Sequence, residues 1–422
     1  MRVASARGRH DTKLATPPAP PPASLSTIDE RKSRQMDPMK IAVLGAGNIA
    51  IQPNGVLPNL HHIADKAVVT AVADPVAEKA EDAAARFGIP KAFTTVDDML
   101  DYGDFDAVVN LTPIPVHGET SLKILRAGKH LTTEKPVAVT IDEADALAEA
   151  ADANGLSVVC APPNMLYPTR REARRILAAN TIGQVAFVRH RSSGPGPAAG
   201  AWPSDPSWFY QKGSGPMFDI GVYSMHEVLG ILNRPAKRVF GFFGITEATR
   251  TVPSGPVAGL TFPVTANDNN LVLLDFGDSL FCVIDGTYNV WAAKSPRMEI
   301  FGREGVLNMW RNLNETEGQQ LEVYRVDHEH GTRGWFDVDI RDLQFAQQHV
   351  NNLKRALIVE HLVDVVRGTR PNELSLDIAR HALEIMLAAE EASTTGQAVE
   401  LKTSFTPAKF DRGVRDGALI HG

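Results

Sequence analysis

The feature that most constrains this fold lies between Met39 and Asp74. An apolar run at residues 40–44 opens directly into Gly45-Ala46-Gly47-Asn48-Ile49-Ala50, and a second apolar run ends in Asp74. In such a unit the first glycine permits a tight turn, the second lets the backbone approach a pyrophosphate, and alanine is tolerated in place of a third. The following helix start faces the phosphates, and the acid at the second strand bonds ribose hydroxyls. We therefore expect a dinucleotide to contact Gly45, Gly47, Asn48, Ile49 and Asp74.

The acid also indicates which dinucleotide. A carboxylate at Asp74 would repel the 2'-phosphate of NADP, and Pro75 and Val76 supply no adjacent cation to offset that repulsion. NAD is therefore favoured over NADP, unless Lys79 or Arg86 folds back onto the site. Asp74 could instead cap the next helix, and both roles can coexist.

Bulk properties exclude several classes of protein. The chain has 422 residues, enough for two or three domains, and a net charge of -7, so no basic surface for nucleic acid is expected. Its two cysteines, Cys160 and Cys282, make neither a disulfide framework nor a metal motif. We expect a cytoplasmic protein without a bound metal. No apolar run reaches the roughly 20 residues that cross a bilayer, so no membrane association is expected.

The pattern along the chain divides it into four parts. Residues 1–37 are proline-rich and poor in apolar clusters, which predicts a disordered extension. Residues 38–163 alternate strand and helix patterns, which predicts a doubly wound parallel sheet of five strands, or six if residues 91–94 form one. Residues 164–402 carry longer strands joined by short turns, which predicts a second, sheet-based domain. Residues 403–422 form a tail without a visible role. The predicted helices are 77–87, 117–127, 141–154, 170–178, 219–232, 345–367 and 376–393, and the later strands are 185–191, 238–245, 270–276, 279–286, 297–302 and 321–326.

Polar residues follow two strands of the predicted parallel sheet. One strand ends in Asn110-Leu111-Thr112-Pro113 with His117 just beyond, and the next leads to Glu134-Lys135-Pro136. Each fragment alone has an ordinary explanation as a turn, a helix start or a solvated ion pair. Together they lie at the carboxyl ends of parallel strands, where open α/β sheets bind ligands.

At this point the chain resembles the glucose-fructose oxidoreductase, inositol dehydrogenase and MocA (Gfo/Idh/MocA) family of NAD(P)-dependent oxidoreductases. The resemblance runs from about Lys40 to Lys402. Its anchors are the glycine turn, Asn110 to His117, Glu134-Lys135-Pro136, Gly213 to Tyr223, Ala392-Ser393 and Val399-Glu400-Leu401. It implies a Rossmann domain followed by an α+β domain with a large, mostly antiparallel open sheet, which often joins subunits into homodimers or homotetramers. It also implies that Asn110, Thr112, Pro113, His117, Glu134 and Lys135 face the cofactor.

The same resemblance assigns catalytic residues. Lys135 matches the catalytic lysine of the family, and Asp219 with Tyr223 resembles the branches in which the tyrosine is the proposed acid/base. Many members have an acid three residues later, where this chain has His226. That departure leaves His226 as a second candidate proton carrier and substrate contact.

The chemistry of the residues agrees with these roles. A phenol, whose ordinary pKa is about 10, is a poor base at neutral pH, and a nearby ammonium favours its phenolate form. If residues 219–232 are helical, Asp219, Tyr223 and His226 share one face. The ordinary alternative is that the tyrosine and the histidine only pack against the core.

Substrate preference is thinly encoded. Trp202, Trp208 and Tyr210 precede the glycine-rich turn, and aromatic faces pack well on pyranose rings. These rings could equally anchor a long loop. Asn164 lies near a position that contacts substrate in many relatives.

Three functions follow. The favoured one is an NAD-dependent dehydrogenase acting on a secondary alcohol of a sugar, polyol or glycoside. The second is an enzyme that retains NAD and cleaves or epimerises glycosides by transient ring oxidation. The third is a non-catalytic sensor of sugar or nucleotide.

Overall fold

The computed structural model describes residues 37–310, 321–338 and 344–408. From Pro38 onward the chain forms one compact unit. All of the predicted extension except Asp37 lies outside the described residues, as does the tail beyond Ala408. Among the described residues, no helix has the length and apolar character that crossing a membrane requires.

The N-terminal half is built on a six-stranded parallel sheet with the order β3-β2-β1-β4-β5-β6. The strands are β1 (Met39–Leu44), β2 (Ala67–Ala73), β3 (Lys91–Phe93), β4 (Ala107–Asn110), β5 (His130–Thr133) and β6 (Val158–Cys160). The central strands are continuous apolar runs because both faces of the sheet are covered. The predicted Rossmann sheet is confirmed, and the short run at 91–93 is its sixth strand.

Capping residues explain where the surrounding helices begin and end. The helices are α2 (Ala77–Phe87), α3 (Val96–Tyr102), α4 (Ile114–Arg126) and α5 (Ile141–Asn154). Helix α5 begins after Thr140, whose hydroxyl accepts from Glu143 N at 3.2 Å, and ends at left-handed Gly155. The prediction missed α3, although Thr95 and Asp98 form the same start signal and Gly103 ends it.

The helix after the glycine turn is much shorter than expected. Helix α1 (Asn48–Ile51) has one turn, and a 3-10 segment, η1 (Leu57–Ile63), follows. Pro53 explains the break, because the residue before a proline is pushed out of the helical region and Gln52 is extended. A helix of one turn contributes little of the dipole that the glycine turn leads one to expect, so the backbone N–H groups of the turn are the candidate anion contacts.

The second half is built on a nine-stranded sheet with the order β16-β15-β14-β13-β7-β12-β11-β8-β17. Its strands are β7 (Val185–Arg191), β8 (Arg238–Gly244), β11 (Asn269–Asp275), β12 (Phe281–Thr287), β13 (Met298–Gly302), β14 (Gly305–Met309), β15 (Leu321–Asp327), β16 (Thr332–Asp337) and β17 (Val399–Glu400). Every pair is antiparallel except β7 with β12. The predicted α/β fold class, with a mostly antiparallel second sheet, is confirmed, although β14, β16 and β17 were not foreseen.

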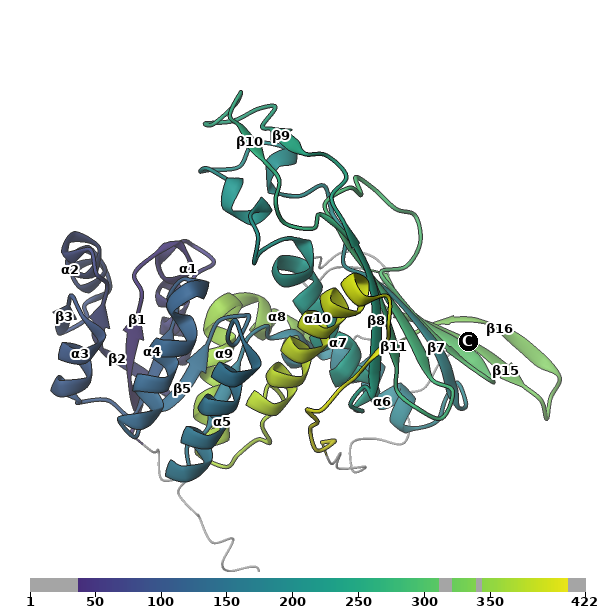
Figure 1. Ribbon diagram of the computed structural model, residues 1–422. Coiled ribbons are helices and arrows are strands. Elements are labelled where there is room, and N and C mark those ends of the chain that lie inside the picture. The colour runs from purple at the N-terminus through teal and green to yellow at the C-terminus, as the bar shows by residue number, and fades with distance from the viewer. Residues whose placement is uncertain (1–36, 311–320, 339–343, 409–422) are drawn as a thin grey trace, which may run out of the picture. The chain divides into compact units, whose positions relative to one another are not determined.

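Helices cover one face of this sheet. Helices α6 (Pro168–Ala178), α7 (Val222–Leu232) and α10 (Leu376–Thr395) pack on one another and on strands β7 and β8. A separate two-stranded hairpin, β9 (Thr249–Thr251) with β10 (Thr261–Pro263), projects from the end of the large sheet (Figure 1). On the outer face of β8, β11 and β12 the side chains of Phe242, Leu271, Leu273 and Phe281 are exposed.

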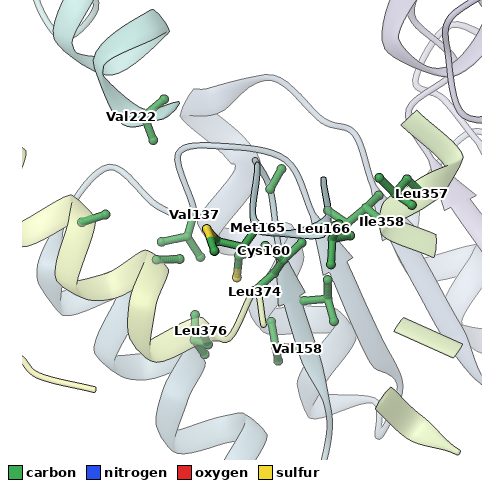
Figure 2. Close-up of a cluster of buried hydrophobic side chains, with 14 of the residues drawn as sticks. Val137, Val158, Cys160, Met165, Leu166, Val222, Leu357, Ile358, Leu374 and Leu376 are labelled. Atoms are coloured by element: carbon green, nitrogen blue, oxygen red, sulfur yellow. The ribbon is translucent and has the colours of Figure 1, made fainter. Parts of the chain in front are cut away.

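The C-terminal helices return to the Rossmann half. The predicted helix 345–367 is broken into α8 (Gln344–Leu353), a 3-10 turn η7 (Lys354–Ala356) and α9 (Leu357–Val366). The break occurs at Lys354, which has a left-handed φ of 49°. Helix α9 packs on β5 and β6. Figure 2 shows the resulting apolar cluster, in which Cys160 and Met165 meet Ile358 of α9 and Leu374 before α10.

A buried ionic network fixes helix α7 in place. Arg170 of α6 donates to Glu227 of α7 at 2.9 Å, and His190 of β7 lies 2.6 Å from the other Glu227 oxygen. Burial alone would raise the pKa of the Glu227 carboxyl, but Arg170 and His190 hold it far below its usual range. The carboxylate therefore stays charged and ties two helices to the sheet.

Replacement of Glu227 by glutamine should destabilise the protein strongly. The change leaves the Arg170 guanidinium buried without its counter-charge, which typically costs about 3–5 kcal/mol. Urea denaturation followed by circular dichroism measures the loss. Asp278→Asn, which breaks an exposed pair with Arg234, is the control and should cost less than about 1 kcal/mol. Equal losses for the two variants would contradict this account.

Candidate active site

Lys135 stands where the two halves of the molecule meet. It follows β5, and its Nζ donates to the backbone oxygen of Asp219 at 2.7 Å and to Asp219 Oδ1 at 3.2 Å. The same Nζ lies 5.1 Å from the ring centre of Tyr223. The structure thus brings together an ammonium from the Rossmann half and a carboxylate and a phenol from the other half.

The approach to α7 has an unusual backbone. Residues 219–232 were predicted as one regular helix, but Met217–Gly221 form a π-helical turn and α7 begins at Val222. Such wide turns are frequent at functional sites. The turn aims the Asp219 carbonyl as well as its carboxylate at Lys135, which an uninterrupted α-helix would not do because its carbonyls bond within the helix.

The surroundings of Lys135 favour its charged form. Burial alone would lower the pKa of this ammonium, but Tyr223 as phenolate, Asp219 and Glu134 together outweigh burial and raise the pKa above its ordinary value. The amine is therefore protonated at neutral pH and acts as a positive charge and hydrogen-bond donor. It cannot serve as the general base in that state.

A cleft of about 400 Å³ opens beside this group. It is lined by Asn54, Glu134, Ala161, Pro162, Pro163, Tyr167, Tyr223, Val350, Asn351, Lys354, Arg355 and Ile358. Arg355 donates to Glu134 at 3.1 Å. No hydrogen bond within the described residues engages the hydroxyls of Tyr167 and Tyr223, so both are available to a ligand in the cleft. No cluster of three or more potential metal ligands occurs among the described residues.

Two residues predicted to reach the substrate lie in the interior instead. His226 is 3 % exposed and does not line the cleft, and burial lowers its pKa to about 4. The neutral ring packs inside the second domain, so the geometry gives no support for a proton-carrying role. Asn164 is fully buried and donates to the Tyr223 backbone oxygen at 3.0 Å. It steadies the backbone that carries the phenol.

The polar residues after β4 support the backbone next to Lys135 through hydrogen bonds. Asn110 accepts from the Thr112 hydroxyl at 2.8 Å, and that hydroxyl lies 3.0 Å from His117 Nδ1. His117 Nε2 lies 3.0 Å from the Glu134 carbonyl, next to Lys135, and burial lowers the pKa of this imidazole. Asn110 and His117 are both buried, whereas Thr112 and Pro113 reach the surface. The two buried residues hold the backbone of the Glu134-Lys135 segment, and the two outer ones remain the candidates for cofactor contact.

The glycine turn fits a dinucleotide. Asp74 Oδ2 accepts from Ala46 N at 2.9 Å, and Oδ1 accepts from Val76 N at 3.0 Å, just before α2. The Asp74 side chain therefore closes the turn, while Val76 rather than Asp74 is the N-cap of α2. A Cβ at Gly47 would meet nothing within 4 Å, so the outer side of the turn is open to a pyrophosphate. Asn48 and Ile49 continue this open edge.

The aromatic residues after Ala201 separate into two groups. Tyr210 is 1 % exposed and packs against Tyr288 and Phe262, as the packing alternative predicted. Trp208 is 51 % exposed and stacks on Phe209, with Trp202 at the edge of the same ring. Of the three predicted aromatic contacts, Trp202 and Trp208 are exposed, but neither lines the cleft beside Lys135.

Sequence reasoning missed three residues of this region. Tyr167 and Arg355 line the cleft, and Tyr288 bonds Asp219. No sequence motif marked Arg355 as a cleft residue. It lies in the turn η7, within a segment that the apolar periodicity predicts to be one continuous helix. Tyr167 lies three residues after Asn164. The segment that the resemblance singled out at Asn164 therefore also contains Tyr167.

Two glycine variants should separate stability from cofactor binding. In Gly45→Ala the added Cβ would lie 2.9 Å from the Leu111 oxygen at a φ of +99°, so the melting temperature should fall by several degrees. Gly47→Ala meets no protein atom, so its melting temperature should stay unchanged while NAD affinity falls about tenfold or more. Thermal denaturation and titration calorimetry measure the two quantities. Unchanged NAD affinity in Gly47→Ala would place the pyrophosphate elsewhere.

Comparison with known proteins identifies the family. Residues 39–161 match the family model described as "Oxidoreductase family, NAD-binding Rossmann fold", and residues 170–308 match the "GFO/IDH/MocA C-terminal domain". A scyllo-inositol 2-dehydrogenase (NAD(+)) of Bacillus subtilis is 22% identical over 86% of this chain and 96% of its own. A levoglucosan dehydrogenase of Pseudarthrobacter phenanthrenivorans is 27% identical over 56% of this chain and 63% of its own.

A solved structure shares the fold. An oxidoreductase domain protein from Kribbella flavida superposes with a TM-score of 0.73 and 23% identity, over 87% of this chain and 100% of that one. The two family models together span more than half of the chain and include both halves of the site. The chain therefore belongs to the Gfo/Idh/MocA family of NAD-binding oxidoreductases.

Proposed function

We propose that this protein is a dehydrogenase that oxidises a secondary alcohol of a sugar, polyol or glycoside, or reduces the matching carbonyl, with NAD. Two relatives support the substrate class, because their names describe dehydrogenases of an inositol and of levoglucosan. Bound NAD would supply the hydride acceptor at the carboxyl ends of β4 and β5. Hydride leaves the alcohol carbon while the hydroxyl proton passes to the protein.

The residues of the cleft divide the proton chemistry between them. Tyr223, as phenolate, takes the hydroxyl proton, and the Lys135 ammonium beside its ring stabilises that phenolate by its charge. The ion pair with Asp219 keeps the Lys135 ammonium next to Tyr223 during the reaction. The Tyr167 hydroxyl and the Arg355 guanidinium line the same cleft and offer hydrogen bonds to further substrate oxygens.

One observation carries the proposal: the distance of 5.1 Å between Lys135 Nζ and the Tyr223 ring, at a cleft that contains the phenol. A sensor protein gains nothing from this pairing, whereas an alcohol dehydrogenase requires a proton acceptor whose basicity is tuned. Burial of His226 leaves Tyr223 as the one titratable proton carrier among the predicted set that faces the cleft.

Substitutions of the pair test the proposal. Lys135→Met and Tyr223→Phe should each lower kcat about 100-fold or more, which is the usual contribution of general acid–base catalysis, and Tyr223→Phe should leave NAD affinity nearly unchanged. NADH formation is followed at 340 nm with a panel of pyranoses, inositols, anhydrosugars and glycosides. Lys91→Met and Tyr324→Phe, which lie outside the cleft, are the matched controls and should retain activity.

Two outcomes would contradict the dehydrogenase proposal. One is the absence of turnover in both directions across the whole panel with NAD bound. The other is full activity in both Lys135→Met and Tyr223→Phe. Release of an aglycone without net NADH would instead favour transient ring oxidation.

We propose further that a second copy of this chain covers the outer face of the large sheet. Along β8 and β11 the side chains alternate, and Phe240, Phe242, Leu271 and Leu273 point away from the covering helices. Phe281 of β12 extends the same patch. Exposed apolar side chains gathered on neighbouring strands favour an interface, and the same sheet face on two copies can pair about a two-fold axis.

A charge in the middle of this patch should separate the subunits. Leu273→Lys would bury an ammonium against Phe240 and Val283, its strand neighbours, so the dimer or tetramer should dissociate to a smaller species. Light scattering after gel filtration gives the mass. Val68→Lys, at an exposed position of β2, serves as control. A wild-type monomer of about one chain mass, or an unchanged mass for Leu273→Lys, would refute this interface.

A further inference from the structure

Tyr288 connects the second domain to the catalytic group. It is the first residue after β12, is 2 % exposed, and donates from its hydroxyl to Asp219 Oδ2 at 2.9 Å. Asp219 therefore has a different partner on each side. Tyr288 holds one carboxylate oxygen, and Lys135 holds the other oxygen and the backbone carbonyl.

The ring of Tyr288 has little freedom to move. The Tyr210 ring lies 5.1 Å away centre to centre. The backbone of Gly196 approaches so closely that a Cβ there would lie 2.7 Å from Tyr288 Cγ, at a φ of +79°. The main chain is tied as well, because Tyr288 N donates to the Asp268 carbonyl at 3.0 Å, and the Asp268 carboxylate pairs with Arg250 at 2.7 Å.

The Tyr288 hydroxyl acts as a hydrogen-bond donor to Asp219. Burial and the neighbouring Asp219 carboxylate raise the pKa of Tyr288 well above its ordinary value, so the phenol keeps its proton at neutral pH. A hydrogen bond from such a donor to one oxygen restricts the rotation of the Asp219 carboxylate. Its second oxygen then points at Lys135 without the cost of ordering a free side chain.

We infer that Tyr288 is a positioning residue, which orients the Asp219 carboxylate so that Asp219 in turn holds the Lys135 ammonium beside Tyr223. This inference rests on the proposed role of Lys135 and deepens it by one further residue. Tyr288 does not line the cleft, so it acts through Asp219 rather than on the substrate. The buried cluster that contains Tyr210, Phe262 and Tyr288 holds the Tyr288 ring in place and so supports the orientation of the Asp219 carboxylate.

The pKa of Lys135 is a direct measure of the coupling between Tyr288, Asp219 and Lys135. The charged or titratable groups that face its amine are Tyr223, Asp219 and Glu134, and Arg355 is paired with Glu134. If Asp219 turns away, the ammonium loses its nearest hydrogen-bonded counter-charge and a larger fraction of Lys135 is unprotonated at a given pH. Trace labelling of native protein with acetic anhydride from pH 7 to 11, quantified by mass spectrometry of peptides, measures that fraction, with Lys91 as internal standard.

Tyr288→Phe should raise the labelling rate of Lys135 about tenfold near pH 9 and displace its pH profile by about one unit toward lower pH. Asp219→Asn should produce the same displacement while leaving Tyr288 in place. The double variant should match Asp219→Asn alone, because Tyr288 acts only through the carboxylate. Tyr210→Phe is the control, since it removes a hydroxyl from the same cluster that accepts from Ala198 N and does not touch Asp219.

The results distinguish this inference from the proposed function, because labelling requires no substrate. An unchanged Lys135 profile in Tyr288→Phe, or additive effects in the double variant, would overturn the positioning role even if the enzyme oxidises sugars. An equal displacement in Tyr210→Phe would reduce Tyr288 to a packing residue and also overturn it. Thermal denaturation of each variant verifies that it is folded, and Asp219→Asn tests the link from the other side should Tyr288→Phe not fold.

Discussion

The contact between the Lys135 ammonium and Asp219 is the constraint on which the rest of the site depends. The lysine belongs to the Rossmann half and the aspartate to the π-helical turn before α7, so the contact exists only while the two halves hold their relative position. A displacement of one or two ångströms would lengthen a 2.7 Å hydrogen bond beyond its useful range. The geometry of the proposed catalytic group is therefore a property of the packing between the halves.

That packing is provided by segments in the C-terminal part of the second domain. Helix α9 returns to the Rossmann sheet, where Lys66 pairs with Glu360 at 2.9 Å and with Asp364 at 2.9 Å. The loop before α10 adds Glu373, which pairs with Arg174 of α6. Met165 and Ile358 belong to an apolar cluster that adds side-chain packing between these segments (Figure 2). The charged pairs orient the C-terminal segments relative to the Rossmann half, and the burial of apolar side chains supplies most of the free energy of this packing.

The sequence predicted well those parts of the fold that short-range physics determines. Helices 77–87 and 141–154 begin and end as expected because a capping threonine or a left-handed glycine acts within four residues. The break at Lys354 was not predictable, because the apolar periodicity runs through it and only packing favours a left-handed lysine. Lys135, Asp219 and Tyr223 were found by motif. Tyr288 was not, because the partner of its hydroxyl lies 69 residues away and only the folded sheet brings the two together.

The glycine turn keeps its shape although the helix that follows it has only one turn. With one helical turn before Pro53, little dipole is available, so the turn must hold its own shape. Asp74 does this by accepting one backbone N–H on each carboxylate oxygen, from Ala46 and from Val76. Each oxygen has a second lone pair for a ribose hydroxyl. The residue predicted to select the nucleotide is thus also the residue that closes the turn, so a substitution of Asp74 would change cofactor preference and the stability of the first β-α connection together.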